Sequence, residues 1–264
     1  MWGDDQPDTV TGDDSGVVVA SRKKKGFNRE AVSLLWEKFL YAANAVVVLN
    51  IEKREFDVAM DILTKLEKWY ERVELLPTNE KERQALRAQL YESFSYFFYK
   101  KQKNPAALSN CNKAHEIYES VDNVEMIAIS LLHVACVHCQ SLRYKESHAC
   151  LQEFLGLLDE GRLAIEESNV KYLCLVAVAY HNLAVVQLKL DVPDLAAKSS
   201  QSAKKIARIC LSYSNRWIKE FEHTHNCAVE EIKFQMAANH GLEHDHIQVM
   251  DPVIEELYDD GSKS

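Results

Sequence analysis

The stretch that decides the fold is Tyr180-His181-Asn182-Leu183-Ala184, followed nine positions later by Pro193-Asp194-Leu195-Ala196-Ala197. In this stretch the small residues Ala184 and Ala196 lie twelve positions apart. At helical pitch, twelve residues lead from the middle of one helix, across a tight turn, to the same depth in the next helix. Two small residues at this spacing therefore predict two antiparallel helices in close contact.

The same pairing occurs four times along the chain. The other three pairs of small or β-branched residues are Val47 with Ala59, Ser95 with Ala107, and Ala135 with Ser147. Apolar residues at three- and four-residue spacing surround each pair, as in amphipathic helices. Hairpins are expected over about 29–76, 80–121, 125–160 and 168–203, and the helical pattern then continues to about residue 238. The predicted fold is all-α, an α-solenoid of antiparallel helical hairpins with a C-terminal capping helix.

Local signals set several of the expected helix ends. Pro77 cannot extend the helix that precedes it, so the first hairpin should close there. Asn104-Pro105 is expected to begin a helix, with the Asn104 side chain as its cap. The fourth hairpin should turn through Asp191-Val192 and resume at Pro193. The closing helix, which continues from the last hairpin, is expected to bend near 212–215.

Composition narrows the class of protein. The 264 residues are 47% hydrophobic and 27% charged, with only 8 Gly and 5 Pro, which suits a helical body with a full core. The formal net charge of -9 argues against a nucleic-acid binder. Seven cysteines, an odd number without a secretory signal, indicate free thiols in a reducing compartment. No apolar run approaches the roughly 20 residues of a membrane span, so we expect a cytoplasmic protein, with association to the cytoskeleton as one option.

The two ends differ from the middle in composition. Residues 1–26 hold five aspartates and the basic block Arg22-Lys23-Lys24-Lys25, with almost nothing to pack, and are expected to be a disordered tail. The domain is assigned to 27–238. Residues 239–264 form an acidic tail with one short helix indicated over 252–258, where Asp251-Pro252 is a good start. That segment is read either as a docking peptide or as a solvated tail, and we favour the solvated tail.

The spacing within each hairpin resembles that of the tetratricopeptide repeat. Further core positions fall four and seven residues after the second small residue of each pair, as at Leu63 and Leu66, and an aromatic precedes it by three, as at Phe56. Successive copies lie 48, 40 and 49 residues apart, whereas that family repeats every 34 or so. The chain therefore looks like a long-repeat variety, and the resemblance implies a protein-interaction fold over about 29–211 without indicating a particular partner.

The resemblance also implies which residues line a groove on the concave face. Asn50, Tyr99, His138 and Gln187 are the expected groove positions on the first helices. Family members that clamp a C-terminal carboxylate use Lys, Arg and Asn at fixed groove positions, which in this chain are held by Asn44, Val48, Ser93, Ile129 and His133. The cationic fork is missing from this set. A receptor for carboxylate tails is therefore disfavoured, and the net charge favours basic partner segments.

Two groups of histidine and cysteine were weighed as metal sites. The first comprises His133, Cys136, His138, Cys139, His148 and Cys150. The second comprises His223, His225, Cys227, His240, Glu243, His244, Asp245 and His246. The first coincides with the small-residue core of the third hairpin, and Gly241 weakens any helix in the second, so no metal and no cofactor is expected.

No motif for catalysis stands out in the sequence. Gly-rich phosphate loops, a Ser-centred nucleophile elbow and kinase signatures are not found. We therefore expect a non-enzymatic adaptor or scaffold that binds a protein or peptide, without nucleic acid and without membrane insertion. The alternatives are a structural subunit of a large cytoskeletal, ciliary or flagellar assembly, and a His/Cys-based metal- or redox-responsive protein.

Overall fold

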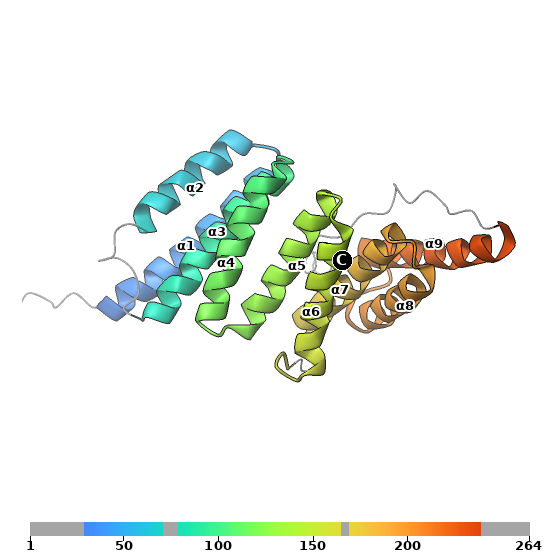
Figure 1. Cartoon of the computed structure of the whole chain (residues 1–264). Helices are drawn as coiled ribbons and strands as arrows, with labels where there is room; N and C mark the ends of the chain where they lie inside the picture. The colour runs from blue at the N-terminus through green and yellow to red at the C-terminus, as the bar shows by residue number, and fades with distance from the viewer. Residues whose placement is uncertain (1–28, 71–78, 165–168, 239–264) are drawn as a thin grey trace, which may run out of the picture.

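The computed structural model describes residues 29–70, 79–164 and 169–238 (Figure 1). Within these ranges the chain consists of nine α-helices and no strand, so the predicted all-α class is confirmed. The tails predicted at 1–26 and 239–264, the short helix at 252–258 and the closure at Pro77 lie outside the described residues. The helices are α1 (Arg29–Glu52), α2 (Phe56–Tyr70), α3 (Glu80–Lys100), α4 (Asn104–Ser120), α5 (Val124–Gln140), α6 (Tyr144–Asp159), α7 (Val170–Lys189), α8 (Pro193–Cys210) and α9 (Arg216–Ala238).

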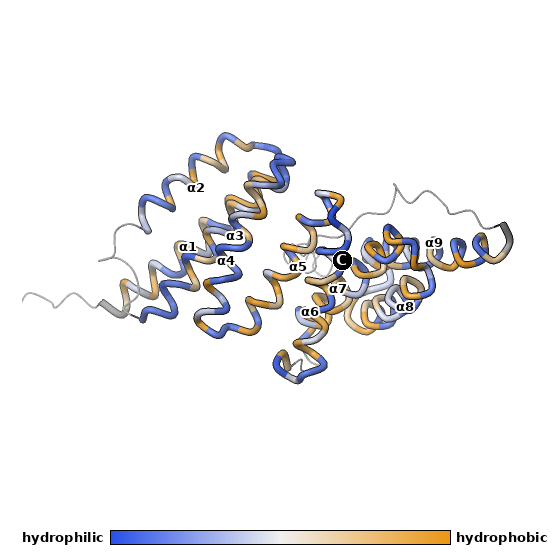
Figure 2. The backbone as a smooth tube through the Cα atoms, in the orientation of Figure 1, coloured by the Kyte–Doolittle hydropathy of each residue, from blue (hydrophilic) through white to orange (hydrophobic). Residues whose placement is uncertain are grey.

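The helices pack in consecutive pairs that form the predicted solenoid. The four hairpins are α1 with α2, α3 with α4, α5 with α6, and α7 with α8, and each hairpin packs against the next. They follow one another from the α1 end to the α9 end of the molecule (Figure 1). Along the helices, hydrophobic and hydrophilic residues alternate in blocks, as expected when a helix buries one face and exposes another (Figure 2).

The twelve-residue pairs lie where the two helices of each hairpin cross. All eight residues are buried. Two of the pairs are also joined by hydrogen bonds across the hairpin. The Ser95 hydroxyl donates to the Ala107 carbonyl at 2.9 Å, and the Ser147 hydroxyl donates to the Ala135 carbonyl at 2.8 Å. Small side chains at these positions let the two backbones approach closely enough for a serine to reach the carbonyl of the facing helix.

Five of the connections between helices use the same three-residue turn. In each, the middle residue adopts a left-handed conformation with φ between 53° and 62°. The following residue donates its N–H to a carbonyl in the last turn of the preceding helix, the bond of a Schellman motif. This turn ends one helix and starts the next without glycine. The left-handed residues are Arg54, Gln102, Asp122, Leu142 and Asp191.

Asparagine side chains begin four of the helices. The side chains of Asn79, Asn123, Asn169 and Asn215 accept hydrogen bonds from backbone N–H groups in the first turns of α3, α5, α7 and α9. These N-terminal caps recur every 44 to 46 residues, which is a more regular interval than that of the small-residue pairs. The regular caps mark the true repeat unit of this solenoid.

The prediction that the Asn104 side chain caps the following helix is wrong. Helix α4 begins at Asn104 itself, and Lys103 takes the cap position without a side-chain hydrogen bond. The Oδ1 atom of Asn104 is buried and has no hydrogen-bond partner. The three-residue turn fixes where α4 starts, and it places Asn104 one position too late to act as a cap.

The end of the solenoid consists of two helices where one bent helix was expected. Helix α8 ends at Cys210, and α9 begins at Arg216. The side-chain oxygen of Asn215 accepts a hydrogen bond of 2.9 Å from the backbone N–H of Trp217. Helix α9 then packs against α7 and α8. Its buried residues Trp217, Ile218 and Phe221 cover the last hairpin, so the expectation of a capping helix is confirmed.

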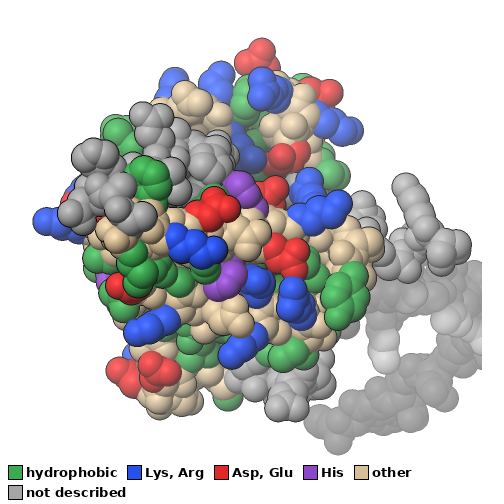
Figure 3. All heavy atoms as spheres, turned by 90° about the vertical axis from the view of Figure 1, so that its right-hand side faces the viewer, with side chains coloured by type: hydrophobic (Ala, Val, Ile, Leu, Met, Phe, Trp, Pro, Cys, Tyr) green, Lys and Arg blue, Asp and Glu red, His purple; other side chains and the backbone are tan. Residues whose placement is uncertain are grey.

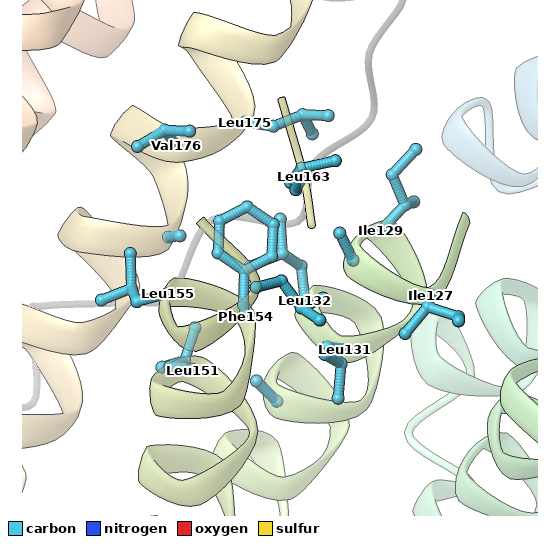
Figure 4. Close-up of a cluster of buried hydrophobic side chains, with 14 of the residues drawn as sticks. Ile127, Ile129, Leu131, Leu132, Leu151, Phe154, Leu155, Leu163, Leu175 and Val176 are labelled. Atoms are coloured by element: carbon cyan, nitrogen blue, oxygen red, sulfur yellow. The ribbon is translucent and has the colours of Figure 1, made fainter. Parts of the chain in front are cut away.

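The largest core lies in the middle of the molecule, between α5, α6 and α7. Phe154 of α6 is fully buried at its centre (Figure 4). Leucines and isoleucines surround the ring from α5 and α6, together with Leu163 beyond the end of α6 and Leu175 of α7. A second core holds α1, α2 and α3 together.

The two ends of the solenoid differ in surface character. The end that contains α8 and α9 carries Lys, Arg, Asp, Glu and His side chains spread among hydrophobic ones (Figure 3). A polar outer face is typical of a terminal capping element. Helix α1, at the other end, leaves large apolar side chains exposed along its length, and Leu35 is 68% exposed. The exposed apolar residues of α1 are Leu34, Leu35, Phe39, Val46 and Leu49.

Two described helices are long and apolar enough to cross a membrane by length and composition. They are Ala31–Glu52 and Val170–Lys189. In the most apolar 18-residue stretch of each helix, 17% of the first and 72% of the second is buried. The sequence predicts no such segment, because neither helix contains an uninterrupted apolar run of about 20 residues. Helix α7 owes its hydropathy to its place inside the solenoid. The expectation that the chain does not insert into a membrane stays a prediction.

Candidate partner-binding groove

A groove of about 530 Å³ lies among the first helices of the first three hairpins. Helices α1, α3 and α5 supply most of its walls, Tyr118 comes from α4, and Lys171 comes from the start of α7. This volume falls within the usual range of ligand sites, roughly 300 to 1,000 Å³. The groove is therefore the natural candidate for a binding site in the described part of the chain.

Each of the three helices lines the groove with one stripe of residues. On α3 the stripe is Ala85, Gln89, Glu92, Tyr96 and Tyr99, spaced by four and three residues in turn. Residues at this spacing lie one above another on the same face of a helix. Corresponding stripes are formed by Tyr41, Asn44 and Val48 on α1, and by Met126, Ile129, His133 and Val137 on α5.

The α3 stripe places a carboxylate in the middle of the groove. The Glu92 side chain is only 12% exposed. One of its oxygens accepts a hydrogen bond of 3.0 Å from the Tyr118 hydroxyl, and the other lies 3.4 Å from His133 Nδ1. Burial, and the negative charge of Glu92 beside it, raise the pKa of Tyr118 well above its ordinary value, so this phenol stays a neutral donor.

Hydrogen bonds tie α1 to α3 along the groove. The Ser93 hydroxyl lies 3.2 Å from Asn44 Oδ1 and donates to it. At the rim, the Tyr96 hydroxyl donates to Glu52, and Lys100 pairs with the same carboxylate at 3.0 Å. The Lys100 ammonium also lies 5.2 Å from the centre of the Tyr96 ring, within the range of a cation–π contact. These contacts join α1 and α3 into one wall of the groove.

The structure brings only one of the four predicted groove residues to this groove. Tyr99 lines it, whereas Asn50, His138 and Gln187 do not. Asn50 donates from its side chain to the Val46 carbonyl of its own helix at 2.7 Å. His138 and Gln187 are buried, and Gln187 accepts a hydrogen bond from Ser199 at 2.8 Å. That any of the four contacts a partner stays a prediction.

Tyr99 lines the groove and the other three residues do not, for a geometric reason. The backbone carbonyls of Asn50, His138 and Gln187 accept the closing hydrogen bonds of the repeated turns. These residues therefore stand at equivalent positions at the ends of the first helices, close to the turn. The equivalent residue in the second hairpin is Phe98, and Tyr99 is one position further along. That single step turns Tyr99 by about 100° around the helix axis, toward the groove.

The positions matched to the family's carboxylate clamp do lie together. Asn44, Val48, Ser93, Ile129 and His133 all line the groove. None of them is Lys or Arg, and His133 lies beside a carboxylate. The residue that the sequence analysis missed is Glu92. Its signal is a charged residue on the same helical face as Gln89 and Tyr96, within a helix that is otherwise rich in aromatic residues.

The candidate metal ligands in α5 and α6 have other roles in the structure. His133 lies beside Glu92, and the sulfur of Cys136 accepts a hydrogen bond of 3.7 Å from the side-chain nitrogen of Asn182. Burial raises the pKa of Cys139 and of Cys150 to about 11, so both thiols are protonated near neutral pH. Within the described residues, no three metal-ligating side chains come together.

The second group falls partly outside the described residues, which end at Ala238. In the described part, His225 contacts the Ser200 hydroxyl at 2.9 Å, and His223 lies 3.8 Å from the Cys227 sulfur. The first contact joins α9 to α8, and the second lies within α9. His240, Glu243, His244, Asp245 and His246 lie beyond the described chain.

Comparison with known proteins adds no family to this description. No protein-family model matches the chain, and no curated protein matches it.

Proposed function

We propose that this protein is a non-enzymatic adaptor that holds a segment of a partner protein in the groove between α1, α3 and α5. The observation that carries the proposal is the set of three residue stripes, one from each of three consecutive hairpins, that line one cavity. A groove built from repeats is the usual way in which a helical solenoid presents a binding surface. The long-repeat tetratricopeptide resemblance supports the same proposal.

The dimensions suit an extended peptide. Fourteen residues of α3 separate Ala85 from Tyr99, which corresponds to about 21 Å along the helix axis. An extended chain advances about 3.3 Å per residue, so about six residues of a partner fit along this stripe. Asn44, Gln89 and Ser93 offer polar groups for a partner backbone, and the tyrosines offer aromatic faces for its side chains.

A matched pair of substitutions tests the proposal. Gln89→Arg places a long charged side chain inside the groove, whereas Gln152→Arg places the same side chain on the exposed surface of α6. Proteins crosslinked to the wild type in a lysate of the source cell should be lost with Gln89→Arg and kept with Gln152→Arg, as measured by quantitative mass spectrometry. Thermal melting establishes that both variants are folded. Equal capture by the two variants would contradict the proposal.

A second function is favoured by one specific feature, the exposed apolar face of α1. A surface with Leu34, Leu35, Phe39, Val46 and Leu49 exposed is unusual for a protein that works alone and is typical of an interaction site. This supports the alternative in which the chain is a structural subunit of a larger cytoskeletal or ciliary assembly.

Size-exclusion chromatography with native mass spectrometry separates the two functions. An adaptor should be a monodisperse folded monomer, whereas an assembly subunit isolated from its neighbours should self-associate through α1. Replacing Leu35 and Val46 by Glu should then restore the monomer. A monomeric wild type at high concentration would argue against the assembly function.

A further inference from the structure

We propose that the groove recognises a cationic side chain of the partner segment, with arginine preferred, and that Glu92 is the anchor for it. The inference rests on the proposed function, because it states which chemistry the adaptor groove selects. It follows from the place of one buried carboxylate, from the charges around it, and from the aromatic wall beside it.

The carboxylate of Glu92 lies deep in the groove, and its neighbours only partly compensate its negative charge. It is 12% exposed, and its two neighbours are the neutral phenol of Tyr118 and the imidazole of His133. The oxygen that faces His133 has no hydrogen-bond partner. A buried charge is costly unless an opposite charge accompanies it, so a cation that enters the groove recovers part of this cost.

Two other charged residues of the groove are Glu125, which is exposed, and Lys171, which is half-buried. Glu125 lies at the start of α5. The ammonium group of Lys171, at the start of α7, lies 5.6 Å from the centre of the Tyr172 ring. Interactions of exposed charges are weakened by water, whereas those of a desolvated charge are not. Glu92 therefore adds a negative charge to the groove that water screens only weakly.

The wall beside Glu92 is aromatic. Tyr41, Tyr96 and Tyr99 line the same groove, and Tyr96 and Tyr99 follow Glu92 on one face of α3. Tyrosine faces in this part of the molecule already hold cations, as Lys100 does over Tyr96 and Lys113 does over Tyr91. A guanidinium group can lie flat on such a ring while its edge donates two parallel hydrogen bonds to a carboxylate, whereas an ammonium group lacks this planar fork. This favours arginine over lysine.

The experiment begins with the full chain and a display library of random twelve-residue peptides. The proposal expects the enriched peptides to share one basic position. Each is then synthesised in two forms, with arginine or with its neutral isostere citrulline at that position, and binding is measured by fluorescence anisotropy. Citrulline should weaken binding to the wild type at least tenfold.

Substitutions assign that loss to Glu92. In Glu92→Gln, which keeps an acceptor for Tyr118, the arginine and citrulline forms should bind within threefold of each other. The control Glu153→Gln, on the exposed surface of α6, should retain the tenfold difference. Tyr99→Leu should also weaken the arginine form more than the citrulline form, which keeps the test decisive if Glu92→Gln folds poorly.

Each outcome has a distinct meaning. Enriched peptides without a shared basic residue, or an equal citrulline loss in the wild type and in Glu92→Gln, overturn the inference and leave the adaptor function standing. Enriched peptides with a shared acidic residue overturn it most directly. A library that yields no enriched peptide overturns the adaptor function itself, and the inference with it.

Discussion

At the scale of single residues, the cysteines differ in their surroundings. The sulfur of Cys174 in α7 donates a hydrogen bond to the sulfur of Cys210 at the end of α8, over 3.5 Å. This hydrogen bond lowers the pKa of Cys210, which is the more exposed of the two, and raises that of Cys174. Cys139 and Cys150 have a pKa raised to about 11 by burial.

These shifts predict which thiol reacts first. The thiolate is the reactive form, and a lowered pKa gives Cys210 a larger thiolate fraction at pH 7.5, whereas Cys139 and Cys150 stay protonated. Iodoacetamide should therefore alkylate Cys210 before the other two in the folded protein, as followed by peptide mass mapping. Cys174→Ala removes the donor and should slow the reaction at Cys210. Faster alkylation of Cys139, or no effect of Cys174→Ala, would contradict this assignment.

At the scale of the element, the repeated turn sets the boundaries of the hairpins. Its middle position requires a left-handed backbone, and Leu142 occupies it between α5 and α6 with φ 59° and a side chain that is 72% exposed. A non-glycine residue is strained in this conformation by about 1–2 kcal/mol. Because the Leu142 side chain is mostly exposed, its packing offsets little of this strain.

Leu142→Gly should therefore stabilise the protein. Relief of strain exceeds the extra chain entropy that glycine adds to the unfolded state, and the net gain should be about 0.5–1 kcal/mol. The free energy of unfolding in urea measures it. The same substitution at Ser141, the preceding residue of the turn, which does not have a positive φ, should be destabilising. A loss of stability with Leu142→Gly would show that the turn is not strained there.

The asparagine caps predict a second effect at this scale. Asn123 and Asn169 each accept a hydrogen bond from a backbone N–H group at the start of a first helix. Replacing either by Ala should lower the free energy of unfolding by about 1 kcal/mol, the usual contribution of such a cap. Asn112→Ala, on the exposed face of α4, is the matched control and should leave stability unchanged or slightly raised. Equal effects at Asn112 and Asn123 would argue against capping.

At the scale of the whole molecule, the sequence determines the architecture more clearly than the site. The small-residue spacing predicted the four hairpins because Ala135 and Ser147, like the other pairs, reflect how closely two backbones can approach. The cap at Asn104 was misplaced because a turn without glycine has no strong sequence signal. The sequence indicates a bend where the structure has a break before Arg216, because the apolar spacing continues on both sides of it.

The groove illustrates where sequence reasoning stops. Repeat spacing identified positions such as Asn44 and His133, which do line it, because each first helix presents the same face. It did not identify Glu92, whose partners Tyr118 and His133 come from two other helices. Such a cluster exists only once the hairpins are stacked. The three other predicted groove residues, Asn50, His138 and Gln187, share one repeat position, but that position lies close to the turns.

The central claim is that the partner segment lies along the α3 stripe. The most direct test replaces single tyrosines by the photo-crosslinker p-benzoylphenylalanine, at Tyr99 in the groove and at Tyr213, which is 84% exposed between α8 and α9. After irradiation with the bound partner, mass spectrometry should find crosslinks at position 99 and none at position 213. Crosslinks at 213, with none at 99, would contradict the claim.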